Sequence, residues 1–579
     1  MQVVRREQKQ QGRFSASIPP ILSRIYAARN VFSDDEIALD LKSLHPPSLL
    51  KGLPEAVQLL MQALENRSRI LIVSDFDADG ATSCALMMRA LASMGFPHVD
   101  YIVPNRFEYG YGLMPEIVAL AAKKKPDLII TVDNGISSIE GVLAANELGM
   151  QVLVTDHHLP GHALPEAAAI VNPNQPECPF PSKALAGVGV VFYLMIALRS
   201  SLREQQWFEK QGIREPNLAN FLDIVALGTV ADVVPLDRNN RILVSEGIKR
   251  IRAGRACAGI NALLRLGKRN PARLVASDLG FAVGPRLNAA GRLDDMSLGI
   301  ECLLIDDERS AMTMAMELDS MNQERKQIEA DMKEQAMRDL EALSLSESST
   351  PSGLCLYNAN WHQGVIGILA SRLKERFHKP VIVFADAGVN SDGEAELKGS
   401  ARSIAGLHIR DVLDSVATHN PGLVSRFGGH AMAAGLSLLK SDFDAFNEAF
   451  AAEVAAQLGE GAQAASILSD GEMAAEQLSL PTAQCLREGG PWGQGFPEPC
   501  FDGRFQVLQQ RVLAGAHLKL VLCPVGQSQH AVDAIAFNVD LEQWPGEQVD
   551  SIDIVYKLDV NEYRGKQSLQ LIIEQISPV

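Results

Sequence analysis

The sequence predicts an α/β protein with a doubly wound parallel sheet, a long helix, a second α/β lobe and a C-terminal β-barrel. Three observations lead to this prediction. Short apolar runs alternate with helix-forming segments between residues 69 and 236, a stretch without Gly or Pro covers 306–343, and short β-like segments follow residue 460. The expected parts are an N-terminal segment 1–45, a sheet domain 46–305, a bridging helix 306–343, a second lobe 350–460 and a barrel 465–579.

Four apolar runs of the sheet domain end in an acidic or histidine-containing turn. They are RILIVSDFDADG (69–80), DLIITVDNGIS (127–137), QVLVTDHHLP (151–160) and FLDIVALGTVADVVPL (221–236). Apolar runs of this length, bounded by turn signals, are typical of strands buried on both faces, so each run predicts a strand. Parallel sheets carry their active sites where such strands end, and we therefore expect the four turns to converge.

The converging turns predict a metal site. Their ionisable side chains are Asp75, Asp77, Asp79, Asp133, Asp156, His157, His158 and Asp232. These acidic groups repel one another unless cations lie between them. Oxygen donors with one or two imidazoles and no thiolate favour Mg²⁺ or Mn²⁺ over structural Zn²⁺, and the histidines slightly favour Mn²⁺. A strand-end aspartate can instead be only a helix N-cap, but four such turns in one domain favour the metal site.

A site for two cations indicates hydrolysis of a phosphoester. Two ions about 3.5–4 Å apart that share a carboxylate form a clamp for in-line displacement at phosphorus. One ion activates water and the other stabilises the leaving oxygen.

The motifs DFDADG, VDNGIS, TDHHLP and GTVADVVPL, in this order and spacing, resemble the four motifs of the DHH phosphoesterase superfamily. The later segments GPRLNAAGR (284–292), KGSARS (398–403) and GGHAMAAG (428–435) resemble the associated DHHA1 domain. The layout is similar to that of the bacterial RecJ family of single-strand-specific exonucleases. The resemblance covers nearly the whole chain.

This resemblance implies a set of metal ligands. Asp77 and Asp133 would hold one ion, and Asp133 would bridge it to the second. The ligands implied for the second ion are Asp79, Asp133, His157 and Asp232. In many relatives a histidine stands four residues before the aspartate that corresponds to Asp77, and this chain has Val73 there. Asp75 is the candidate that would complete the ligands of the first ion.

Two further residues of the turns have catalytic roles by the same resemblance. His158 would face the scissile phosphate and donate to a phosphoryl oxygen as charge builds in the transition state. Asp156 would orient a neighbouring imidazole or cap a helix.

The net charge of −17, from 53 basic and 70 acidic residues, argues against binding a polyanion over the whole surface. A groove needs only local positive charge, and arginine grips phosphate with two parallel hydrogen bonds. The basic residues near glycine-rich turns are Arg106, Arg286, Arg292, Lys398 and Arg402. Any one of them alone is explained more simply as a solvated surface residue. By resemblance, Arg106, Ser400 and Arg402 form a pocket for a terminal 5′ phosphate, with His430 near the cleaved end.

The C-terminal segments predict an OB-fold, a five-stranded barrel that commonly binds single strands. They are RFQVLQQRVL, HLKLVLC, AVDAIAFNV, SIDIVYKLDV and SLQLIIEQI. Such barrels stack bases on aromatic rings, yet this region has few of them. Trp492 is the best candidate for contact with a base, and the alternative is that it fills a joint between domains. The barrel would form part of an annular channel.

The predicted activity is hydrolysis of single-stranded DNA in the 5′→3′ direction, with two Mn²⁺ or Mg²⁺ ions. The alternatives are a phosphodiesterase that acts on oligoribonucleotides or cyclic dinucleotides and a non-catalytic DNA-binding scaffold. The eight cysteines form no CxxC pair and no apolar run reaches membrane length, so we expect a cytoplasmic protein with no membrane contact. Cooperation with single-strand-binding protein and repair helicases follows only from the resemblance. The sequence leaves open the choice of metal, activity on RNA and the oligomeric state.

Overall fold

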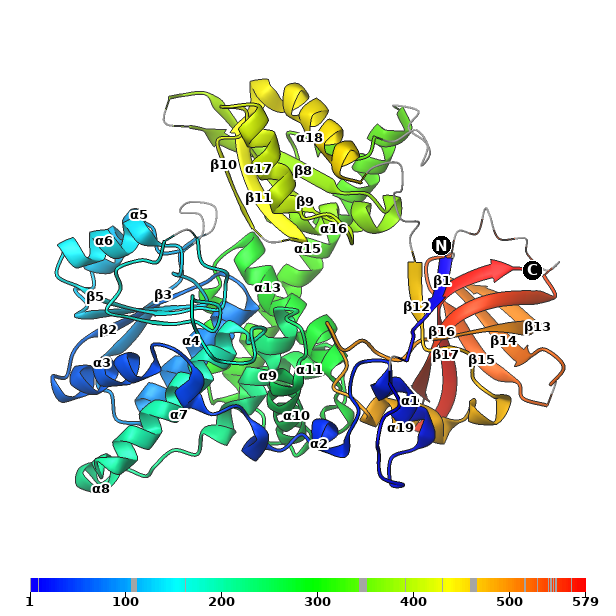
Figure 1. Ribbon diagram of the computed structural model, residues 1–579, viewed down its shortest axis with the longest axis horizontal. Helices are drawn as coiled ribbons and strands as arrows, with labels where there is room; N and C mark the ends of the chain where they lie inside the picture. Colours follow the sequence, from blue (N-terminus) through cyan, green and yellow to red (C-terminus); the bar gives the residue numbers. More distant parts are fainter. Residues whose placement is uncertain are drawn as a thin grey trace. The chain divides into compact units, whose positions relative to one another are not determined.

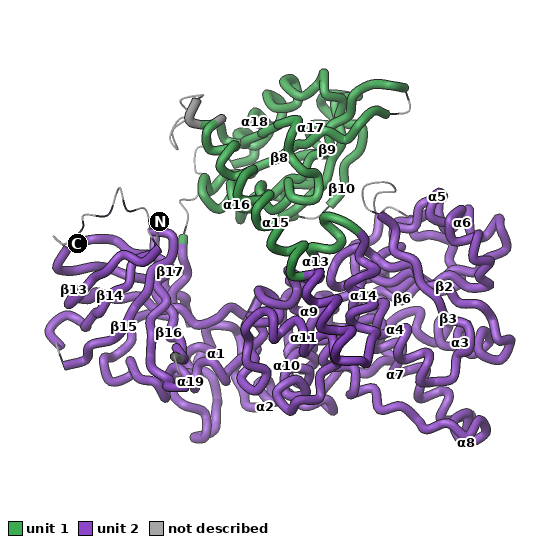
Figure 2. Tube along the Cα trace, turned by 180° about the vertical axis from the view of Figure 1, so that it is seen from behind, with its two compact units in different colours: residues 1, 289–294, 319–466 green, residues 2–288, 295–318, 467–579 purple. Residues whose placement is uncertain are grey.

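The computed structural model forms two compact units, shown in Figure 2. The larger unit comprises Gln2–Asn288, Asp295–Leu318 and Ile467–Val579, and the smaller unit comprises Ala289–Asp294 and Asp319–Ser466. The structure describes residues 2–8, 10–105, 112–161, 163–342, 351–390, 392–429, 431–458, 466–514, 517–527, 529–539, 541, 544, 546, 549–563 and 565–579.

The larger unit contains a five-stranded parallel sheet with the strand order β3-β2-β4-β5-β6. Its strands are β2 (Ile70–Ser74), β3 (Val99–Ile102), β4 (Leu128–Val132), β5 (Gln151–Thr155) and β6 (Ala169–Val171). Every residue of β2 and β4 is buried, which confirms that continuous apolar runs mark strands covered on both faces. Three of the four predicted strands are therefore correct.

Helices cover both faces of this sheet (Figure 1). Alternate strand residues such as Leu71 and Ile129 pack with α5 (Pro115–Ala122) and α6 (Ile139–Glu147). The helices on the other face are α3 (Leu53–Glu65), α4 (Ala78–Ser93) and α7 (Gly187–Glu204). The predicted doubly wound arrangement is therefore present.

The fourth predicted strand is wrong, because residues Leu222–Ala231 form helix α9. This helix packs against α4, α7 and α10 (Arg238–Arg252), and all of its residues from Leu222 to Thr229 are buried. A short run that is apolar on every side shows no periodicity that separates a buried helix from a buried strand. Asp232 therefore lies at the end of a helix and not of a strand.

Helices complete the sheet domain and lead out of it. They are α11 (Ala258–Leu266), α12 (Ala276–Asp278), a π-helical turn (Leu279–Val283), α13 (Gly284–Leu293) and α14 (Ser297–Leu304). The predicted long helix is α15 (Glu308–Ala342), whose 35 residues span about 52 Å at 1.5 Å per residue. It runs from the larger unit into the smaller one.

The smaller unit contains a five-stranded sheet with the order β10-β11-β9-β8-β7. Its elements are β7 (Leu354–Tyr357), α16 (Ile366–Phe377), β8 (Val381–Val389), β9 (Ala395–Arg402), α17 (Ile409–His419), β10 (Arg426–Gly429), β11 (Ala433–Leu439) and α18 (Phe443–Leu458). Only β7 and β8 pair in parallel, and the other pairs are antiparallel. This is the predicted second α/β lobe.

The C-terminal strands close into a barrel in the order β13-β14-β15-β17-β16. They are β13 (Phe501–Leu513), β14 (His517–Pro524), β15 (Val532–Ala536), β16 (Ser551–Tyr563) and β17 (Lys566–Pro578). The pair β15–β17 is parallel, whereas the remaining pairs are antiparallel. All five predicted segments are strands, and the predicted OB-fold is confirmed.

The N-terminal segment packs beside this barrel (Figure 1). Strand β1 (Gln2–Arg5) pairs with β12 (Ser466–Ser469), and the hydroxyl of Tyr26 on α1 (Pro20–Ala27) donates to the carbonyl of Gly489 after α19 (Leu480–Glu488). The remaining short helices are α2 (Asp34–Ile37) and α8 (Trp207–Gln211). Within the described part of the chain, no helix combines the length and the apolar character needed to cross a bilayer.

Candidate metal centre

Strand ends deliver three of the predicted ligands to one edge of the parallel sheet. Asp75 follows β2, Asp133 follows β4, and His157 follows β5 after one residue. Asp133 has a left-handed backbone with φ of 62°, and its N–H donates to the carbonyl of Thr155 at 3.0 Å. A non-glycine residue held in this conformation is strained, and such strain is common at functional sites.

The first turn of α4 carries Asp77 and Asp79. Asp77 is the N-cap, because its Oδ1 accepts from the backbone N–H groups of Asp79 and Gly80 at 2.9 and 3.1 Å. Asp79 is fully buried and accepts from the N–H groups of Gly187 and Val188 at the start of α7, at 2.6 and 2.9 Å. Two helix N-termini therefore stabilise negative charge at this position.

The structure brings the predicted ligands together in three overlapping groups. They are Asp75, Asp77 and Asp133; Asp79, His157 and Asp232; and Asp133, His157 and His158. Within each group the ligand atoms lie within 4.8 Å of one another. Asp133 and His157 each belong to two groups, which is the geometry expected of neighbouring ions that share ligands. Asp75 lies in the group that contains no histidine.

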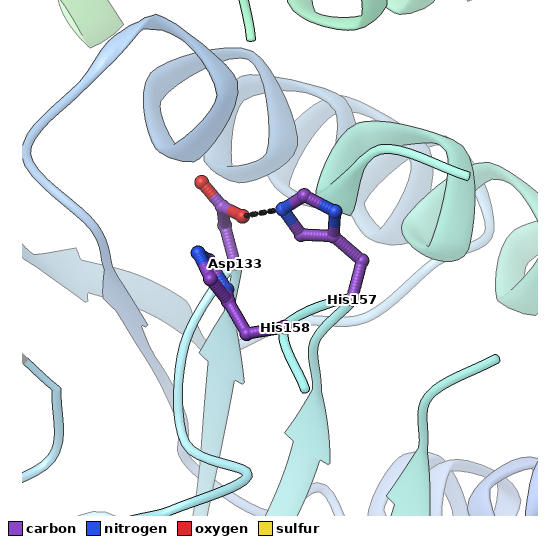
Figure 3. Close-up of side chains that lie close together, drawn as sticks. All are labelled: Asp133, His157 and His158. Carbon is purple, nitrogen blue, oxygen red and sulfur yellow. Dashed lines mark ion pairs between the residues drawn. The ribbon is translucent and has the colours of Figure 1, made fainter. Parts of the chain in front are cut away.

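His157 points its imidazole at three carboxylates. Its Nε2 lies 3.1 Å from Asp133, as Figure 3 shows, and 3.5 and 4.0 Å from Asp232 and Asp79. This nitrogen is buried, yet it makes no well-aligned hydrogen bond to any residue that the structure describes. A buried nitrogen that faces several carboxylates fits a position beside a cation.

Burial and mutual repulsion perturb the acidic groups. Burial, and then the charge of Asp232, raises the pKa of Asp79 to about 7. Burial, and then the charge of Asp77, raises the pKa of Asp232 to about 7. The pKa of Asp133 is raised well above its usual value, by burial and then by Asp79. Bound cations would offset this repulsion, so these residues fit Mg²⁺ or Mn²⁺.

His158 and Asp156 form a separate ion pair beside the ligands. His158 Nδ1 lies 2.7 Å from Asp156 Oδ1, which also accepts from the backbone N–H groups of both histidines. Burial opposes charge on each partner, but their attraction outweighs it, so the pKa of Asp156 falls to about 2 and that of His158 rises to about 9. A charged imidazole at this position can donate to a phosphoryl oxygen.

The sequence reasoning missed several residues that support the ligands. Asn134 Nδ2 donates to the carbonyls of Val73 and Val132 at 3.2 and 2.9 Å, which holds the ends of β2 and β4 together. Asn288 Oδ1 accepts from the N–H of Ala78 at 2.8 Å and so caps the helix that carries Asp79. Asn134 lies in the motif VDNGIS and Asn288 in GPRLNAAGR. Their place inside these motifs is the sequence signal that could have pointed to them.

A close approach at Gly187 also shapes the site. A Cβ at this position would lie 2.7 Å from Asp133 Oδ1, closer than real Cβ atoms come. Any larger residue would therefore displace the carboxylate that joins the ligand groups. No pattern in the sequence indicates this contact.

Residues predicted to bind the nucleic-acid strand lie in both compact units. Arg286 is in the larger unit and Arg292 is in the smaller one, and each donates to a backbone carbonyl. In the smaller unit, Arg402 donates to Ser400 Oγ at 3.1 Å and to Ser371 Oγ at 3.2 Å. Arg106 and His430 lie outside the described residues.

Trp492 packs at the joint between the N-terminal helix and the C-terminal region. Its ring stacks on Phe496 at 5.0 Å and on Tyr26 at 6.1 Å, and its Nε1 donates to the carbonyl of Leu486. These contacts agree with the alternative that Trp492 fills a joint between domains. Contact with a base stays a prediction.

Models of known families match three parts of the chain. The DHH family N-terminal domain matches residues 69–229, the DHHA1 domain matches 350–456 and the RecJ OB domain matches 469–575. The segment GPRLNAAGR (284–292) lies outside the DHHA1 match. It forms α13, whose asparagine caps α4.

Relatives and solved structures agree with these matches. The single-stranded-DNA-specific exonuclease RecJ of Dickeya dadantii is 57% identical over 563 residues, which cover 97% of each chain. RecJ of Thermus thermophilus in complex with Mn²⁺ has a TM-score of 0.78 at 29% identity and covers 97% of this chain and 76% of its own. The complex of that protein with Mg²⁺ has a TM-score of 0.72 at 27% identity, with coverage of 97% and 75%. The chain therefore belongs to the RecJ family of DHH phosphoesterases.

Proposed function

We propose that this protein is a metal-dependent exonuclease that degrades single-stranded DNA in the 5′→3′ direction during DNA recombination and repair. The observation that carries the proposal is the set of overlapping ligand groups that share Asp133 and His157, in a chain of the RecJ family. The reaction is hydrolysis of a phosphodiester bond.

The residues of the centre have distinct tasks in this proposal. Mn²⁺ or Mg²⁺ ions, when bound, would activate water and neutralise charge on the scissile phosphate. The two ions would be held by Asp77, Asp79, Asp133, His157 and Asp232, and Asp75 would complete the first group. His158 donates to a non-bridging phosphoryl oxygen, and Asp156 keeps the imidazole of His158 charged and oriented.

A pocket for the terminal phosphate would set the direction of degradation. Arg402 is half-buried, and burial lowers the pKa of its guanidinium. Among the residues described, no carboxylate forms an ion pair with it, so its charge is available to an anion. We assign Ser400 and Arg402 to the 5′ phosphate. The assignment of Arg106 to this phosphate, and of Arg286, Arg292 and His430 to the strand, stays a prediction from the sequence.

A digestion of single-stranded DNA labelled separately at each end tests the proposal. With Mn²⁺ or Mg²⁺, we expect mononucleotides from the 5′ end and a shrinking 3′-labelled product. A double-stranded substrate should resist. Faster cleavage of a dinucleotide or a cyclic dinucleotide than of a long strand would contradict the proposal and favour a small-substrate phosphodiesterase.

Family membership extends the proposal to the cellular setting. We expect the protein to act in the cytoplasm together with single-strand-binding protein and repair helicases. A pull-down with purified single-strand-binding protein, in the presence and absence of DNA, tests the first partnership.

A further inference from the structure

The two histidines of the metal centre lie just beyond the end of the β5–β6 pairing, which closes with Asp156 N donating to the carbonyl of Val171 at 3.1 Å. Their backbone carbonyls are held by side-chain amides instead. Asn174 Nδ2 donates to the carbonyl of His157 at 2.6 Å, and Asn172 Nδ2 donates to the carbonyl of His158 at 3.0 Å.

These two amides are themselves fixed. Asn172 is fully buried, and its Oδ1 accepts from the backbone N–H of Asn174 at 2.7 Å. Asn174 Nδ2 donates a second hydrogen bond to the carbonyl of Lys183 at 3.1 Å. The ammonium of Lys183 returns to the same loop and donates to the carbonyls of Pro173 and Cys178 at 2.6 and 2.7 Å. The loop is therefore closed on itself by hydrogen bonds.

We propose that Asn172 and Asn174 are positioning residues that hold the backbone of His157 and His158 so that one imidazole meets the metal ligands and the other meets Asp156. The peptide planes of adjacent residues set the directions of their side chains, and here the two rings diverge to different partners although their centroids are 4.5 Å apart. Catalytic groups need placement within about 0.5 Å, which a mobile turn does not supply.

This inference rests on the proposed role of His157 as a metal ligand. Loss of an outer contact of this kind typically weakens metal binding about 10–100-fold. A purely structural loop behaves differently, because its loss lowers the melting temperature and leaves metal affinity and turnover per folded molecule unchanged.

The test compares Asn174→Ala with Asn146→Ala. Asn146 makes the same type of bond in the same domain, from its Nδ2 to the carbonyl of Glu166 at 3.0 Å. Mn²⁺ binding is measured by the electron paramagnetic resonance signal of free Mn²⁺, alongside kcat and KM on single-stranded DNA. We expect Asn174→Ala to raise the Mn²⁺ Kd about 10-fold and to lower kcat with little change in KM, while Asn146→Ala matches the wild type.

The variant His157→Ala distinguishes the positioning role of the asparagines from the proposed role of His157 as a metal ligand. Weaker Mn²⁺ binding in both His157→Ala and Asn174→Ala supports the positioning role. Weaker binding in His157→Ala with wild-type binding and kcat in Asn174→Ala overturns that role alone. Equal binding in wild type and His157→Ala overturns the ligand assignment and the positioning role together. If Asn172→Ala fails to fold, the half-buried Asn174 still provides each of these measurements.

Discussion

Two groups of buried charged side chains in the larger unit differ in how their charge is balanced. At the joint beside the barrel, Arg29 donates to both oxygens of Asp470 at 2.8 and 2.9 Å, and the backbone of Cys500 donates to the same carboxylate. At the metal centre, burial and neighbouring carboxylates raise the pKa values of Asp79, Asp133 and Asp232. The carboxylate of Asp470 is balanced by a guanidinium, whereas the carboxylates of the metal centre outnumber the positive charge that His158 brings to them.

The difference separates structural from functional burial of charge. Breaking a buried ion pair destabilises the fold because it leaves an uncompensated charge in the interior. A buried cluster of like charges destabilises the fold by itself and is retained for what it binds. Substitutions at the two groups should therefore have opposite effects on stability and activity.

The largest effect is expected for Asp133→Ala. Asp133 is shared by two ligand groups, so its removal should reduce cleavage of single-stranded DNA by about 10³-fold or more. Loss of a single contact to the transition state costs up to about 10³-fold. Because a repelling charge is lost, the metal-free protein should not melt earlier than the wild type. The comparison fails if turnover with added Mn²⁺ persists while DNA binding is intact.

Asp470→Ala is the reciprocal change at the joint. It leaves the guanidinium of Arg29 buried without its partner, so the free energy of unfolding should fall by about 3–5 kcal/mol. Denaturant titration measures this loss, and kcat per folded molecule should stay at the wild-type value. A variant as stable as the wild type would show that the pair does not support the joint.

The stability of the metal-free protein should depend on pH through the buried carboxylates of the metal centre. The folded-state pKa values of Asp79 and Asp232 are about 7, above the ordinary value of 3.8, so the folded state binds extra protons between these limits. The free energy of unfolding without metal should therefore fall as pH rises from about 4 to about 7. Mn²⁺ at about 100 times its Kd should add about 2.7 kcal/mol at pH 8. Melting curves that do not respond to Mn²⁺ would contradict this account.

The smallest effect is expected for Arg402→Ala in the smaller unit. Among the described residues, no carboxylate forms an ion pair with Arg402. Loss of the guanidinium should lower the preference for 5′-phosphorylated over 5′-hydroxyl ends by about 10-fold, as for one charged hydrogen bond, and leave cleavage of the 5′-hydroxyl substrate unchanged. Competition between the two labelled substrates measures the preference. An unchanged preference would refute the assignment of Ser400 and Arg402 to the terminal phosphate.

The strand-end pattern predicted which charged side chains cluster, because the ends of parallel strands meet at one edge of the sheet. Residues that follow β2, β4 and β5 therefore converge regardless of the intervening chain. Prediction failed at Leu222–Ala231, where an apolar run without periodicity is a helix. Asp232 nevertheless reaches the cluster, since position at the end of a buried element mattered more than the type of element.

The α/β architecture, the barrel and the identity of the charged side chains could be predicted from the sequence, because they depend on hydrophobic pattern and on ligand chemistry. How those side chains are held depends on the packing of the folded chain. Asn134, Asn172, Asn174 and Asn288 bind backbone groups of distant segments, and an amide that pairs with a carbonyl leaves no periodic signal in the sequence. Hydrogen bonds between segments depend on packing, and packing exists only after the chain has folded.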